Sequence, residues 1–169
     1  MVPANDRGSK AARCLEKAWR MLRRLQPCLP PVVFVILASG GRKKLGHFAD
    51  CVWRTPGEDG GHEVAISPAL FDCPEDLLET LVHEAAHAVL FEAGLNAGCG
   101  GDGYYHREEF QQACRKLGLE CEFNNRRYGW SRTRWPDAGV PAKYDTVLKL
   151  LREDIPLGLS HQGRIVTKS

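Results

Sequence analysis

The sequence has no long apolar run. The longest uninterrupted one, from Val32 to Ala38, is far shorter than the about 20 residues that a membrane-spanning helix needs. No early segment combines a basic start with the apolar stretch of a signal peptide. We therefore expect a soluble protein of the cytoplasm that neither spans a membrane nor is exported.

The sequence also lacks any Cys-x-x-Cys pair, although it contains seven cysteines. Without this spacing, neither a four-cysteine zinc ribbon nor a thioredoxin-like redox pair is expected. An odd number of scattered cysteines does not suit a disulfide framework, so we expect reduced thiols. The formal net charge of +2 is too small to indicate a nucleic-acid partner by itself.

The spacing of apolar residues predicts an α+β fold. Apolar residues recur three and four positions apart in the segments that we expect to be helical, residues 9–26, 73–93, 106–118 and 140–153. Short β-branched or alternating segments predict a sheet of about three strands, over residues 32–37, 45–53 and 62–67. Pro68 follows the last of these, which we expect at an edge of the sheet.

The chain is long enough for one domain with its own hydrophobic core. We expect residues 1–30 to form a basic N-terminal helix that belongs to this domain. Residues 31–155 carry the rest of the domain, including every motif described below. Residues 156–169 are expected to be a flexible C-terminal tail.

The central predicted helix carries the motif His83-Glu84-Ala85-Ala86-His87. Residues four apart on an α-helix lie on one side, about 6 Å apart along the axis, so both imidazoles can bind a single ion. In hydrolytic zinc sites, a carboxylate beside such a pair takes a proton from the metal's water. We therefore predict one catalytic zinc ion, with His83 and His87 as ligands and Glu84 as the general base.

A catalytic zinc ion normally has three protein ligands. The next predicted helix offers His106 at its start, with Glu109 close behind. We predict His106 as the third ligand, because Phe110, one turn further along, can anchor that end of the helix in the core. The sequence leaves Glu109 open as the alternative ligand.

Two motifs taken together resemble the SprT-like metallopeptidases, a family that includes the Spartan proteases. They are His83-Glu84-x-x-His87-Ala88, and His106-x-x-x-Phe110 followed by Leu117-Gly118-Leu119. The resemblance extends upstream to Ile66-Ser67-Pro68 and covers about residues 45–133. It implies a minimal zincin-like domain with zinc ligands His83, His87 and His106 and the general base Glu84. It also implies hydrolysis of peptide bonds, which in the Spartan branch are those of proteins crosslinked to DNA.

The sequence departs from the family pattern in two places. Arg107 follows the third histidine, where the family often has glycine. The C-terminal four-cysteine zinc ribbon of many members has no counterpart in this sequence. DNA recruitment through such a ribbon is therefore not implied.

Two surfaces are predicted to meet partners. A protein or peptide substrate is expected to pair with the strand predicted over residues 62–67, because zincins commonly align an extended substrate along an edge strand. Four arginines alternate with aromatic residues further along the chain, a mixture that suits phosphate contacts and base stacking. The DNA contacts expected here are Arg126, Arg127, Arg132, Arg134 and Trp130.

Two other functions remain open on the sequence alone. One is a repressor-cleaving metallopeptidase of a mobile element, which shares the His-Glu-x-x-His motif. The other is a non-catalytic module in which zinc stabilises the fold and the arginine-rich segment binds nucleic acid. Both peptidase functions need Glu84 as a general base, whereas the non-catalytic module gives Glu84 no role.

Overall fold

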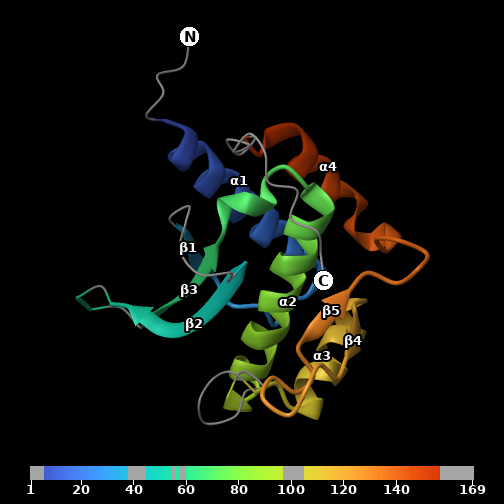
Figure 1. Cartoon of the computed structure of the whole chain (residues 1–169). Helices are drawn as coiled ribbons and strands as arrows, with labels where there is room; N and C mark the ends of the chain where they lie inside the picture. The colour runs from blue at the N-terminus through green and yellow to red at the C-terminus, as the bar shows by residue number, and fades with distance from the viewer. Residues whose placement is uncertain (1–5, 38–44, 55, 58–59, 97–104, 157–169) are drawn as a thin grey trace.

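The structure is a computed structural model that describes residues 6–37, 45–54, 56, 57, 60–96 and 105–156. Within these residues the chain forms four α-helices, a three-stranded sheet and a smaller two-stranded sheet (Figure 1). This arrangement confirms the α+β fold predicted from the spacing of apolar residues. The predicted C-terminal tail lies outside the described residues from position 157 onward.

The helices are α1 (Arg7–Leu25), α2 (Pro74–Glu92), α3 (Glu108–Leu117) and α4 (Asp145–Asp154). The strands are β1 (Val32–Ile36), β2 (Gly46–Trp53), β3 (Gly61–Ile66), β4 (Glu120–Glu122) and β5 (Arg132–Arg134). Three strands and four helices therefore lie where the sequence predicts them. The predicted first residues of α3 and α4 are too early in the chain. The sequence did not predict β4 and β5.

The three-stranded sheet has β3 in its centre. β3 pairs in parallel with β1 and antiparallel with β2, so that Val64 lies between Phe34 and Phe48. The prediction of an edge strand over residues 62–67 is therefore wrong, and no peptide can pair with β3 because both of its edges are occupied. Pro68 follows the strand and takes part in neither pairing, so its presence does not indicate whether the strand lies in the centre or at an edge of the sheet.

Helix α2 runs through the middle of the molecule. The three-stranded sheet lies on one side of it, and α3 with the β4–β5 sheet lies on the other (Figure 1). Most of its side chains are buried, including Leu77, Leu81 and Ala86. Helix α1 contributes its apolar face to the same core, and the Trp19 indole donates a hydrogen bond to the Pro30 carbonyl at 2.8 Å.

The cysteines in the described part of the chain are all free thiols. In that same part, no helix combines the length and the apolar character that crossing a membrane requires.

Candidate metal centre

Three histidines meet on one side of α2. His83 and His87 project from this helix, and His106 lies two residues before the start of α3. One nitrogen of each imidazole lies within 4.8 Å of the others. Among the described histidines, cysteines and acidic residues, this is the one group of three that could hold a metal ion.

The distance between two of these nitrogens suits a tetrahedral zinc ion. The Nε2 atoms of His87 and His106 are 3.1 Å apart. Zinc binds imidazole nitrogen at about 2.0–2.1 Å, so two neighbouring ligands of a tetrahedral ion lie about 3.3 Å from each other. The donor set fits zinc as well, because imidazole is among its preferred ligands.

His106 is oriented through its second ring nitrogen. Its Nδ1 lies 3.3 Å from the carbonyl oxygen of Tyr128. A carbonyl can only accept, so Nδ1 carries the proton and donates it. The Nε2 atom that faces His87 therefore has a free lone pair, which is the form of imidazole that binds metals.

The backbone of His106 is held from both sides by residues 128–130. Its N–H donates to the Tyr128 carbonyl, and its own carbonyl accepts from the Trp130 N–H, both at 3.0 Å. Gly129, between these partners, has a φ of +61°, and a Cβ added to it would lie 2.1 Å from the His106 oxygen. Only glycine fits there, so a turn more than 20 residues away positions His106.

Phe110 forms an apolar wall behind the three imidazoles. This residue has no exposed surface. Its ring centroid lies 4.8 Å from that of His83, 4.3 Å from that of His87 and 4.6 Å from that of His106. Phe110 therefore anchors the start of α3 beside the histidines, the role that its spacing from His106 predicts.

The environment of His83 keeps its imidazole neutral. Burial, followed by the proximity of His106, lowers the pKa of His83 to about 3. The ring is therefore uncharged at neutral pH and can donate a nitrogen lone pair to a cation. Its Nδ1 lies 3.1 Å from the hydroxyl oxygen of Thr133 on β5.

Glu84 lies on α2 between the two histidines and is only 4% exposed. The first residue of β2 passes directly over its carboxylate, because a Cβ added to Gly46 would lie 2.7 Å from Glu84 Oε1. Glu109, the alternative third ligand, is exposed on the first turn of α3 and does not belong to the histidine group.

The arginine-rich segment divides into two parts. Arg134 on β5 forms ion pairs with Glu120, with Glu122 at 3.6 Å and with Asp137 at 2.8 Å. Arg126, Arg127 and Arg132 are exposed and form no ion pair within the described part of the chain.

Trp130 is half-buried against the core and meets Phe123 edge to face, with ring centroids 5.6 Å apart. One predicted DNA contact, Arg134, is therefore engaged within the small sheet. Trp130 is in part a packing residue.

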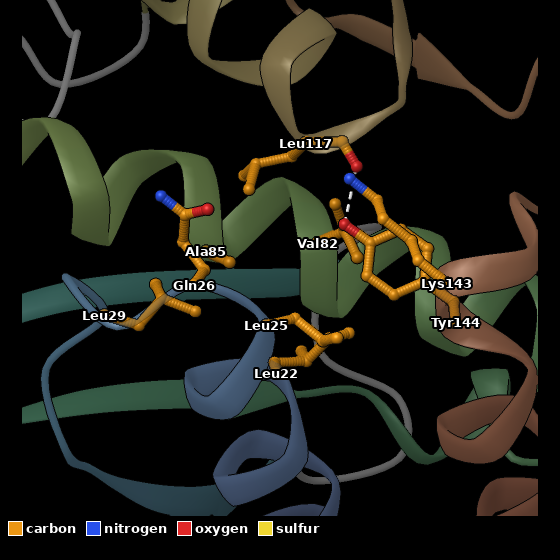
Figure 2. Close-up of a pocket in the computed structure, with 9 residues that line it drawn as sticks. All are labelled: Leu22, Leu25, Gln26, Leu29, Val82, Ala85, Leu117, Lys143 and Tyr144. Atoms are coloured by element: carbon orange, nitrogen blue, oxygen red, sulfur yellow. Dashed lines mark hydrogen bonds between the residues drawn. The ribbon is translucent and has the colours of Figure 1, made fainter.

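A small cavity lies between α1, α2 and α3, away from the histidines (Figure 2). Apolar residues such as Leu22, Val82 and Leu117 line it, and the Tyr144 hydroxyl donates to the Leu117 carbonyl at its rim. Its volume of about 20 Å³ is enough for one water molecule and too small for a substrate. No histidine lines it.

Sequence reasoning missed Thr133 and Gly129. Thr133 is 50 residues from His83, in a segment where three residues per strand leave no periodicity to detect. Gly129 follows Asn125-Arg126-Arg127-Tyr128, whose Asn side chain accepts from the N–H groups of Arg127 and Tyr128. Asn and Gly predict a turn, but not that the turn meets His106.

One comparison with known proteins identifies the family. The family model described as "SprT-like family" matches residues 36–129, a range that contains His83, Glu84, His87 and His106. No curated protein and no solved structure matches the chain. Because the family match covers more than half of the 169 residues, the chain belongs to the SprT-like family.

Proposed function

We propose that this protein is a zinc-dependent endopeptidase with a minimal zincin-like domain. The observation that carries the proposal is the convergence of His83, His87 and His106, with the buried Glu84 between two of them on the same helix. A buried carboxylate with no chemical role would cost free energy without benefit, since burying a charge is expensive. Membership of the SprT-like family supports the same reading.

The chain's own residues divide the work of hydrolysis. His83, His87 and His106 would hold the ion, and a zinc ion held here would supply a water of lowered pKa and a Lewis acid for the peptide carbonyl. Glu84 takes the proton of the attacking water and delivers it to the leaving amine nitrogen. Glycine at position 46 leaves room for this carboxylate, because an added Cβ would lie 2.7 Å from Glu84 Oε1.

The zinc content tests the three-histidine site. We expect the purified protein to hold about one zinc ion per chain, and His106→Ala to lower its zinc affinity by more than about 100-fold, because one of three ligands is lost. Competition with a chromophoric chelator measures both quantities. Glu109→Ala is the matched control and should bind zinc as the wild type does.

Two outcomes would contradict this expectation in different ways. If Glu109→Ala lost zinc and His106→Ala kept it, Glu109 would be the third ligand. A wild-type protein that took up no zinc would end the enzyme proposal.

Glu84→Gln tests whether the centre is catalytic. The amide cannot accept the proton of water, so we expect peptide cleavage to fall by about 10²–10⁴-fold, with zinc content unchanged. Cleavage of a proteome-derived peptide library, followed by mass spectrometry, measures the loss. The non-catalytic module predicts that Glu84→Gln behaves as the wild type in every assay.

Strand β2 supports a position for the substrate. It pairs with β3 along one edge only, and no second strand pairs with it in the described residues. Its first residue, Gly46, lies against Glu84, so the free edge of β2 begins beside the general base. An extended peptide that pairs with this edge would place a backbone amide near Glu84.

Hydrogen exchange can locate the peptide. We expect a bound peptide to slow amide exchange across residues 46–53 of zinc-loaded Glu84→Gln, because new backbone hydrogen bonds form along the free edge. The amides of β3 should change little, since both of their edges are already paired. A peptide that bound without slowing exchange in β2 would show that it lies elsewhere.

DNA-associated proteins are the substrate class that we propose within this function. The supporting observation is that Arg126, Arg127 and Arg132 are exposed and free of ion pairs within the described residues. They lie next to Tyr128, Gly129 and Trp130, the segment that holds His106. A nucleic acid bound there would bring attached proteins close to the metal centre.

Salt-dependent binding of single-stranded DNA tests this substrate class. Replacing Arg126, Arg127 and Arg132 by alanine should weaken binding and reduce the slope of log K against log salt by about 2, since each phosphate contact on a single strand contributes about 0.7. The control replaces Lys10, Arg20 and Arg24 on α1, which removes the same charge. Equal effects of both triple changes would mean that only the total charge matters.

A further inference from the structure

Thr133 connects one metal ligand to a carboxylate of the same helix. Its hydroxyl oxygen lies 3.1 Å from His83 Nδ1 and 3.3 Å from Glu79 Oε1, to which it donates. Glu79 and His83 are four residues apart on α2, so they occupy the same side of the helix. Thr133 reaches them from β5 and bridges one helical turn.

The direction of these hydrogen bonds follows from the chemistry of the three groups. A hydroxyl has one proton, and the Thr133 hydroxyl gives its proton to the Glu79 carboxylate, which can only accept. The hydroxyl oxygen must then accept the proton of His83 Nδ1. This places the ring proton on Nδ1 and leaves the lone pair on Nε2.

The bridge is held in place by the rest of the small sheet. Thr133 is paired with Cys121 of β4, and two residues further on the Trp135 indole donates to the carbonyl of Glu75 at 3.0 Å. Glu75, Glu79, His83 and His87 follow one another at four-residue steps along α2. The segment from Thr133 to Trp135 therefore runs beside the row of side chains that ends in two metal ligands.

We infer that Thr133 is a positioning residue for the metal centre, which orients His83 and relays the negative charge of Glu79 to it. Ligating histidines commonly donate their second ring N–H to an oxygen that fixes the ring and raises its basicity. Thr133 supplies that oxygen here, with Glu79 behind it. This inference rests on the proposed zinc site and assigns a role to a residue beyond the range matched by the family model.

The role is distinguishable from simple packing. Valine has nearly the shape of threonine but no hydroxyl, so Thr133→Val removes the bridge and preserves the volume. Serine keeps the hydroxyl, so Thr133→Ser restores the bridge. A packing role would make serine the more damaging change, because it loses a methyl group, whereas the positioning role makes valine the more damaging one.

Zinc affinity measured on the full chain tests the inference. We expect Thr133→Val to weaken zinc binding by about 10–100-fold and Thr133→Ser to remain within about threefold of the wild type. The visible spectrum of the cobalt-substituted protein should change in the valine variant, because His83 is no longer held in one orientation. Thr146→Val, on the exposed side of α4, is the control for the same chemical change.

The outcomes separate this inference from the proposed function. If the wild type binds zinc and Thr133→Val binds it equally well, the positioning role is wrong while the zinc site stands. If the wild type binds no zinc, both are wrong. Should Thr133→Val fail to fold, Glu79→Gln replaces it: a loss of zinc affinity of about tenfold is expected, and none would overturn the inference.

Discussion

The pairing of His106 with residues 128–130 is the constraint on which the metal centre depends. His83 and His87 share a helix, and their spacing is set by helical geometry. His106 has no such support, because it lies before α3 and not within it. Two backbone hydrogen bonds and the absence of a side chain at Gly129 bring it to within 3.1 Å of His87.

The second constraint is the low polarity around α2. Glu84 and His87 are buried on a helix whose other buried residues are all apolar, and each unsatisfied polar group there would cost about 1–3 kcal/mol. Within the described residues, every buried side-chain nitrogen and oxygen has a hydrogen-bond partner. Thr133, Tyr128 and the histidines themselves supply partners to the imidazoles, so contacts among the chain's own residues orient these rings.

The small β4–β5 sheet links these constraints. Its strand β5 places Thr133 beside His83, and the segment between its two strands places Gly129 beside His106. Arg134 forms ion pairs with three carboxylates in and beside this sheet. The neighbouring Arg126, Arg127 and Arg132 are exposed and form no ion pair within the described residues. One stretch of sequence therefore combines residues that build the centre with the exposed arginines for which we propose a nucleic-acid contact, and composition alone could not separate the two groups.

The sequence by itself determined the α+β class, the position of α2 and the pairing of His83 with His87, because these depend on local periodicity and on the geometry of a single helix. The spacing of Phe110 from His106 also indicated which residue anchors the start of α3. Only the tertiary structure decided that β3 is central, since strand order depends on contacts between distant segments. It also revealed the partners of His106 and His83, because a three-residue strand and a turn leave no periodic signal, and their roles arise only when residues 128–133 pack against α2.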